Sequence, residues 1–323
     1  MEYLKTNKLQ SDFILKNQKP ENGKMFSQLK KIIDFVMEHS RINGLRDYSD
    51  QLNEVINLFR NDKNTIPKFE HVLVDEFQDV NSIQMELIRL LEPENLFFVG
   101  DPRQSIFGWR GSRIDYILSF EKENKDAEIL YLTKNYRSSK KIVEFMNAIS
   151  SEFSLPNLSS TRNDTGEVRI LEFENPESEI AFIVESIRND YEKFLDTFIL
   201  ARTNRQIEEI SKSLSIRGIQ HKIKTDEGTR GSGKLTLATI HAIKGLEADA
   251  VFIVGADDKN LPCRVPESPI TEIIREEYDR FSEEKRLFYV AVSRAKKRLT
   301  LTFSGKPSYF ITDELMSIAN RQA

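Results

Sequence analysis

The sequence contains a single cysteine, Cys263, so an intrachain disulfide is excluded. Its four histidines, His39, His71, His221 and His241, are scattered and do not show the spacing of a metal site. No apolar run approaches the ~20 residues that a helix needs to cross a bilayer. We therefore expect a cytoplasmic protein in a reducing environment, with no membrane as a partner.

An excess of positive charge is also missing. The 323 residues include 47 Lys and Arg against 51 Asp and Glu, for a net charge of −4. No overall basic field attracts nucleic acid, so any DNA contact must come from a local groove. With 39% hydrophobic residues, the chain is long enough to build two domains with ordinary cores.

Two adjacent carboxylates follow a short apolar run early in the chain. The residues at 72–74 read Val-Leu-Val and lead directly into Asp75 and Glu76. This is the pattern of a buried parallel strand that ends at the carboxyl edge of a sheet, where open α/β folds bind their ligands. In an NTPase, such acids hold Mg²⁺ and align or deprotonate the attacking water. A strand that runs into the acidic first turn of a helix explains the same residues equally well.

Strands alternate with helices along most of the chain after a polar, irregular start at residues 1–24. Strands are expected at 72–75, 96–99, 129–132, 168–173, 198–200, 235–240, 250–254 and 298–304. Helices are expected at 25–36, 45–59, 82–91, 139–149, 177–195 and 207–214. This alternation predicts an α/β protein with doubly wound, mainly parallel sheets.

A second stretch distinguishes between the two interpretations of the acid pair. The strand at 96–99 ends in GDPRQSIFGWRGS, residues 100–112, which is too polar for a core and too constrained in composition for a passive loop. Together with VDEFQD at 74–79, it resembles motifs II and III of the UvrD/Rep-like superfamily 1 DNA helicases. Later motifs of the family resemble NYRSS at 135–139, LATIHAIKGLE at 237–247 and EKRLFYVAVSRA at 284–295.

The resemblance implies a motor that clamps ATP between two RecA-like domains while single-stranded DNA crosses their top, moving 3′ to 5′. By that resemblance, residues 1–70 are a helical remnant of a first-domain insertion, residues 71–135 a truncated first RecA-like domain, and residues 136–323 the second. The implied cofactors are ATP and Mg²⁺. The implied partners are single-stranded DNA, or DNA with a single-stranded tail, and repair or replication proteins.

The first half of the chain carries three residues that the resemblance assigns to the nucleotide. Asp75 would hold Mg²⁺ and Glu76 would act as the catalytic base. Gln104 would sense the γ-phosphate.

The second half carries four more. Arg137 would contact the γ-phosphate, Tyr136 would stack on adenine, and Glu247 would bind the ribose. Arg294 would be the arginine finger. Without the family context, a polar helix start explains NYRSS, and a basic helix end explains the charges around Arg294.

Five residues are assigned to DNA by the same resemblance. Trp109, the only tryptophan, lies in a polar, glycine-flanked loop, and its family counterpart stacks on a base. Stacking of this kind tolerates any sequence and is worth ~1–3 kcal/mol per base. Arg110 and Phe107 belong to the same contact, and Phe107 stands where many members have tyrosine. His241 and Lys244 would face the DNA backbone. A lone tryptophan is otherwise usually a core residue.

Two parts of the family pattern are missing. Residues 1–70 contain no glycine-rich loop with Lys-Ser or Lys-Thr. The one GxxxxGK match, Gly228 to Lys234, is followed by Leu235 and is interpreted as a turn. Only the residues from 225 to 234 separate the strand near 223 from the following motif, where family members carry a large subdomain.

Two hypotheses follow from the missing loop. The chain is either a truncated helicase that hydrolyses ATP poorly by itself, or a natural relative that binds DNA or a partner without hydrolysis. Truncation is favoured because Glu76, Gln104, Arg137 and Arg294 are all present, and a silent binding module has no physical need for all four. An unrelated α/β domain would require five ordered motifs to arise by coincidence.

Overall fold

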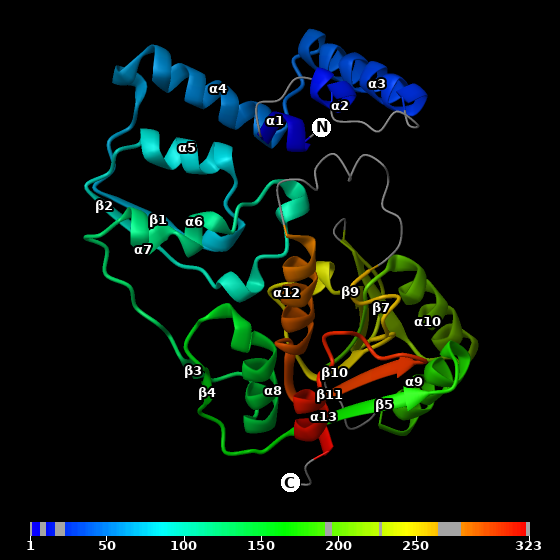
Figure 1. The fold of residues 1–323 in the computed structure, drawn as a ribbon. Helices are drawn as coiled ribbons and strands as arrows, with labels where there is room; N and C mark the ends of the chain where they lie inside the picture. Colours follow the sequence, from blue (N-terminus) through cyan, green and yellow to red (C-terminus); the bar gives the residue numbers. More distant parts are fainter. Residues whose placement is uncertain are drawn as a thin grey trace. The chain divides into compact units, whose positions relative to one another are not determined.

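The computed structural model describes residues 2–6, 11–16, 23–190, 196–225, 228–263 and 279–320. These residues form two compact units, shown in Figure 1. The first unit holds the described residues up to Glu128, together with Asp279 and Arg280. The second unit holds the other described residues from Ile129 onward.

The first unit begins with helices. They are α1 (Glu2–Thr6), α2 (Asp12–Lys16), α3 (Gly23–Ile42) and α4 (Tyr48–Asn61). Leu4 and Ile14 are buried against Phe26 and Ile33 of α3. The irregular start expected at 1–24 is therefore wrong for α1 and α2, because each is too short to show a helical period and is stabilised by burial against α3. The amphipathic helices α3 and α4 were predicted and are confirmed.

A two-stranded parallel sheet follows, formed by β1 (His71–Val74) and β2 (Asn95–Phe98). Between them lies α5 (Ser82–Leu90), and Asn81 caps it as predicted, in a reciprocal pair with Gln84. Short elements complete the unit. They are η2 (Lys63–Thr65), η3 (Phe77–Asp79), η4 (Pro102–Gln104), η5 (Gly108–Arg110), α6 (Asp115–Leu118) and α7 (Phe120–Glu123).

The predicted burial of the first strand is wrong. Leu73 in β1 is 71% exposed, and its register partner Phe97 in β2 is 57% exposed. The apolar pattern is that of a strand covered on both faces. Within the described residues, however, β1 and β2 pair only with each other. The sequence thus predicted the strand and its direction, but this face is left open.

The second unit is built on a seven-stranded sheet in the order β5-β11-β10-β6-β9-β7-β8. All its pairs are parallel except β7 with β8. The strands are β5 (Glu167–Phe173), β6 (Thr197–Ala201), β7 (His221–Thr225), β8 (Gly228–Gly231), β9 (Leu235–Thr239), β10 (Ala248–Ile253) and β11 (Ala295–Ser304). A separate small sheet pairs β3 (Lys134–Asn135) with β4 (Ser159–Ser160).

Helices cover both faces of this sheet. They are α8 (Lys140–Ser150), α9 (Pro176–Asp190), α10 (Asn204–Ile216), α12 (Arg280–Val292) and α13 (Asp313–Asn320), with the short turns η6 (Ser151–Phe153) and η7 (His241–Ile243). In Figure 1, α9 and α10 lie on one side of the sheet and α8 and α12 on the other. The predicted class, α/β with mainly parallel sheets, is confirmed.

Two local predictions in or next to the second unit are wrong. Residues 129–132 form no strand, and Leu132 is 91% exposed. Their apolar pattern suits a sheet, but no described strand pairs with them. Gly228–Gly231, interpreted as a turn, instead forms β8 and pairs with β7. A side chain at Gly231 would lie 2.4 Å from the His221 carbonyl oxygen, so the hairpin needs glycine there.

The last part of the helix predicted at 177–195 lies outside the described residues. No helix in the described part of the chain has both the length and the apolar character to cross a bilayer.

Candidate functional site

The acid pair lies immediately after β1, at the carboxyl end of the two-stranded sheet. Asp75 Oδ1 accepts a hydrogen bond from the Glu76 amide at 2.8 Å. Glu76 has a φ of 51°, in the left-handed region that side-chain-bearing residues rarely adopt. Such a conformation persists only where its surroundings hold it. Both acids are exposed, so the chain turns sharply and presents two carboxylates at the edge where α/β sheets bind ligands.

Gln78 holds this turn in place and was missed by sequence reasoning. Its buried side chain donates from Nε2 to Glu76 Oε2 at 2.5 Å and accepts at Oε1 from the Asp101 amide at 2.9 Å. A side chain at Gly100 would lie 2.7 Å from Gln78 Oε1 and would push the Gln78 side chain away from this position. The sequence offered one signal, a glutamine inside VDEFQD, but nothing local indicates that it reaches the end of β2.

Gln104 is connected to the same chain of hydrogen bonds. It lies in η4, where Asp101 caps the turn through the Arg103 amide. Gln104 Nε2 donates to Asp101 Oδ2 at 3.0 Å. Glu76, Gln78, Asp101 and Gln104 are thereby linked from the end of β1 to the end of β2. The structure thus connects two of the sequence-predicted residues, Glu76 and Gln104, through two that were not predicted.

We expect Gln78→Leu to lower the free energy of unfolding of the first unit by about 1–3 kcal/mol, because it leaves the half-buried backbone amide of Asp101 without its hydrogen-bond acceptor. Urea denaturation of the full chain measures this effect. Gln51→Leu, at an exposed position on α4, is the matched control and should change little. Equal effects from the two substitutions would show that Gln78 does not brace the turn.

Trp109 lies in η5 and is 41% exposed, so it is not a core residue. The Arg110 guanidinium lies 4.5 Å from the centre of the Trp109 ring and 5.3 Å from that of Phe107. The loop returns to the segment after β1, where Ser112 Oγ donates to the Asp79 carbonyl at 2.7 Å. The three predicted DNA contacts of this loop therefore lie together, and the guanidinium packs on both aromatic rings.

In the second unit, NYRSS is anchored on the start of β11. The amides of Arg137 and Ser138 donate to Asn135 Oδ1, at 3.0 and 2.8 Å. Ser138 Oγ donates to the Ala295 carbonyl at 2.7 Å, and the Ser139 amide to the Lys296 carbonyl at 2.9 Å. These bonds fix the backbone on both sides of Arg137, so its side chain starts from a defined position.

Arg137, Glu247 and Arg294 come together in the second unit. The Arg137 guanidinium forms an ion pair with the Glu247 carboxylate and donates to the Ser293 carbonyl at 3.4 Å. Lys296 Nζ lies 2.9 Å from Glu247 Oε1. Arg294 is 2% exposed. Its guanidinium donates to the carbonyls of Val290 and Leu246, at 3.0 and 3.2 Å, and to Ser293 Oγ at 2.7 Å.

Three motifs that are far apart in the sequence thus place a carboxylate and two guanidinium groups in one cluster. We call Arg137, Glu247, Arg294 and Lys296 the arginine cluster. Lys296 was not assigned to the site from the sequence, and it lies at the start of β11.

The hydrogen bond from Lys296, and then the charge of Arg137, hold the pKa of Glu247 below its ordinary value of 4.5. A lowered pKa means that the ion pairs add stability above that ordinary value, and that this stability is lost as the pH falls through the folded pKa. Glu247→Gln should therefore lower the thermal midpoint near neutral pH and lose its effect well below pH 4.5. Exposed Glu128→Gln is the control. A difference that stays constant with pH would contradict this prediction.

The other predicted residues of the second unit are Tyr136, His241 and Lys244. Tyr136 is exposed, next to Arg137. His241 begins η7, directly after β9, and Lys244 follows that turn; both are half-buried. They thus lie at the carboxyl end of a central strand.

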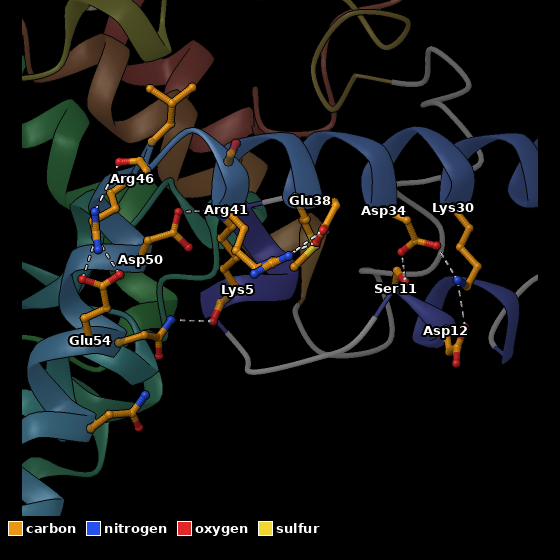
Figure 2. Close-up of a pocket in the computed structure, with 16 residues that line it drawn as sticks. Lys5, Ser11, Asp12, Lys30, Asp34, Glu38, Arg41, Arg46, Asp50 and Glu54 are labelled. Carbon is orange, nitrogen blue, oxygen red and sulfur yellow. Dashed lines mark hydrogen bonds and ion pairs between the residues drawn. The ribbon is translucent and has the colours of Figure 1, made fainter.

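A polar groove of about 620 Å³ lies among α1 to α4, and it contains none of the predicted site residues (Figure 2). Its basic side chains are paired with neighbouring carboxylates: Lys5 with Asp47 and Asp50, Lys30 with Asp34 and Asp12, Arg41 with Glu38, and Arg46 with Glu54. Because these charges compensate one another, the groove is best explained as a network that joins the helices.

Two family models match the sequence. The model described as the UvrD/REP helicase N-terminal domain matches residues 1–125. The model described as the UvrD-like helicase C-terminal domain matches residues 130–228 and 223–306.

Several curated proteins are similar to the chain. A probable DNA helicase of Mycoplasma pneumoniae is 29% identical over 275 residues, which cover 80% of this chain and 49% of that protein. The ATP-dependent DNA helicase PcrA of Staphylococcus aureus is 37% identical over 176 residues, which cover 51% of this chain and 24% of that protein. The chain therefore spans about half of the first relative and about a quarter of the second.

One solved structure is similar to the chain, the C-terminal domain of a possible DNA helicase from Lactobacillus plantarum WCFS1. It is 25% identical, covers 56% of this chain and 96% of that domain, and has a TM-score of 0.40.

Proposed function

Since the chain belongs to the UvrD/Rep-like family of DNA helicases, we propose that it is the motor part of an enzyme that couples ATP hydrolysis to movement along single-stranded DNA. By family resemblance the direction is 3′ to 5′, and the setting is DNA repair or replication in the cytoplasm. The two units of the structure are taken as the two RecA-like halves of the motor.

In this proposal the first unit binds the metal and activates water. Mg²⁺ in nucleotide sites is usually held by one or two carboxylates together with the phosphates of the nucleotide. Asp75 fits this role because it is exposed at the carboxyl edge of β1. The other ligands would be the phosphates of the nucleotide and water, since Mg²⁺ usually keeps several of its waters.

Glu76 is the proposed base, and its neighbours support that role. The Gln78 side chain donates to one carboxylate oxygen and fixes its direction. The same chain of hydrogen bonds reaches Gln104 through Asp101. A γ-phosphate sensed by Gln104 therefore lies within reach of the group that orients water, since both side chains extend from the same edge of the sheet.

The second unit supplies positive charge for phosphoryl transfer, and the arginine cluster is the observation that carries the proposal. In the structure, Arg137 is paired with Glu247, and Arg294 donates to carbonyl groups. Nucleotide phosphates attract these guanidinium groups more strongly than neutral carbonyls do. Binding of ATP would therefore exchange the carbonyl contacts of Arg294 for phosphate contacts, and the phosphates would compete with the Glu247 carboxylate for Arg137.

The Trp109 loop is the proposed DNA contact, and intrinsic fluorescence tests it directly. Trp109 is the only tryptophan in the chain, so its emission reports this loop alone. Titration with oligo-dT should quench the emission, and raising the salt concentration should weaken the binding. An emission that does not change at low salt would contradict the proposed DNA contact.

A second candidate is a catalytically silent module that binds single-stranded DNA or a repair partner. The observation that favours it is the absence of a glycine-rich Lys-Ser or Lys-Thr loop from the sequence. The GxxxxGK match does not supply one, because its first residues form β8 and it is followed by a strand instead of a helix. ATPase measurements distinguish the two candidates, as described in the Discussion.

A further inference from the structure

Positive charge is concentrated in one segment of the second unit, although the net charge of the chain is −4. Residues 217–246 contain six Lys or Arg residues and two acids, Asp226 and Glu227. This segment includes the strands β7, β8 and β9 and the turn η7. A local basic surface is what a chain without an overall positive charge needs in order to bind nucleic acid. The segment therefore carries charge of the sign that such a surface requires.

The side chains of β7 divide between the two faces of the seven-stranded sheet. Ile223 is buried in the core formed with α9 and α10, and His221 Nε2 lies 2.7 Å from Ser211 Oγ on α10. Successive side chains of a strand point to opposite faces. Lys222 and Lys224 therefore share the face that points away from α10. They are two residues apart, which corresponds to about 6.6 Å along a strand.

The charges of these two lysines are not compensated within the described part of the chain, where neither ammonium group forms an ion pair. Both side chains are half-buried. A lysine in such a position lays its apolar stem along the surface and keeps its charge in water. Arg230 differs, because it is the register partner of Ile223 and pairs with Glu208 of α10. The open charges of the hairpin thus lie on one face.

This lysine pair, Lys222 and Lys224, lies beside the segment that carries two of the predicted DNA contacts. β7 pairs in parallel with β9, and Lys224 is the register partner of Ala238 (Figure 1). The chain leaves β9 at Thr239 and enters η7 at His241, and η7 packs beside β7. Cations from two neighbouring strands are thereby gathered toward one end of the sheet.

We propose that Lys222 and Lys224 bind the phosphate backbone of single-stranded DNA and extend the contact assigned to His241 and Lys244. This inference rests on the proposed function, which supplies DNA as the ligand. An ammonium group attracts a phosphate as a point charge and does not read the base. Two such groups in a row on a rigid strand can follow a backbone of any sequence, as the basic grooves of single-strand-binding proteins do.

The test measures the anisotropy of a labelled oligo-dT with the full chain over a series of salt concentrations. Each phosphate contact to a single strand adds about 0.7 to the slope of log affinity against log salt concentration. Lys222→Gln combined with Lys224→Gln should therefore reduce this slope by about 1.4 and weaken binding roughly 25-fold near 0.1 M salt. Lys222→Arg combined with Lys224→Arg keeps both charges and should keep the slope.

Lys212→Gln combined with Arg217→Gln is the matched control. Both residues are exposed and lie at α10, which covers the other face of β7. The control removes the same net charge from the chain and should leave the salt slope unchanged. Circular dichroism and the thermal midpoint should be the same for all variants, because none of the replaced side chains is buried.

The outcomes separate this inference from the proposed function. Binding of oligo-dT with an unchanged slope in the glutamine variant of the lysine pair overturns the inference and leaves the proposed function standing. No binding of oligo-dT by the wild type counts against both. Binding of poly-glutamate, but not of oligo-dT, that depends on the lysine pair would identify an acidic protein as the ligand and overturn the inference. Trp109→Ala should weaken binding without changing the slope, so the two contacts are measured independently.

Discussion

Glu76→Gln is expected to lower DNA-stimulated ATP turnover by about 10²–10⁴-fold, the usual contribution of a positioned acid or base. The assay uses the chain complemented by co-expression with a segment that carries a glycine-rich phosphate loop, which completes the proposed motor. The substitution keeps the shape of the side chain and removes its capacity to take a proton. Nucleotide affinity should change little, because Asp75 and the loop still hold the metal and the phosphates. Steady-state phosphate release with and without oligo-dT measures the effect.

The isolated chain provides the control for this prediction. It is expected to release phosphate near the background rate with either residue at position 76, since its sequence offers no phosphate loop. Robust turnover by the isolated chain that Glu76→Gln abolishes would contradict this account. It would also require another phosphate-binding loop within these 323 residues. Equal turnover by the complemented wild type and the complemented Glu76→Gln variant would show that Glu76 is not the catalytic base.

Trp109→Ala is expected to weaken binding of single-stranded DNA by roughly 5- to 150-fold, which corresponds to the ~1–3 kcal/mol lost with one stacked base. The anisotropy of a labelled oligo-dT measures this loss without relying on tryptophan emission. Trp109→Phe keeps a flat ring and should restore most of the affinity. Because the contact is stacking, the loss should be similar for oligo-dT and a mixed sequence.

Tyr48→Ala is the matched control for Trp109→Ala, because Tyr48 is an exposed aromatic residue of the same unit, on α4. It should leave the affinity unchanged. Equal binding by wild type and Trp109→Ala, with no response to salt, would exclude a stacking groove at this loop.

The sequence predicted the local elements better than the surfaces that they bury. The strand before Asp75 and the cap at Asn81 follow from short patterns, and both are confirmed. The exposure of Leu73 could not be predicted, because the strand pattern indicates what a residue is suited to pack against, and not whether that partner is present. The strand predicted at 129–132 was wrong for the same reason, because a strand forms only beside a neighbouring strand.

In the candidate site, too, the sequence predicted the residues better than the contacts between them. The motifs identified Arg137, Glu247 and Arg294, but the ion pair between Arg137 and Glu247 arises from the way NYRSS docks on the start of β11. Gln78 was overlooked because its partners, Glu76 and Asp101, lie on two different strand ends. Hydrogen bonds between such ends depend on tertiary structure, and residue patterns in a single sequence do not encode them.

The account depends on one proposal, that binding of ATP by the complemented chain requires both the acids of the first unit and the arginine cluster of the second. The most direct measurement is the affinity of the complemented chain for a fluorescent, slowly hydrolysed ATP analogue with Mg²⁺, in Asp75→Asn, in Arg137→Ala and in the double variant. The account predicts that each single change weakens binding, with a coupling of about 0.5–3 kcal/mol in the double variant. Binding that depends on one unit and is unaffected by the substitution in the other would contradict it.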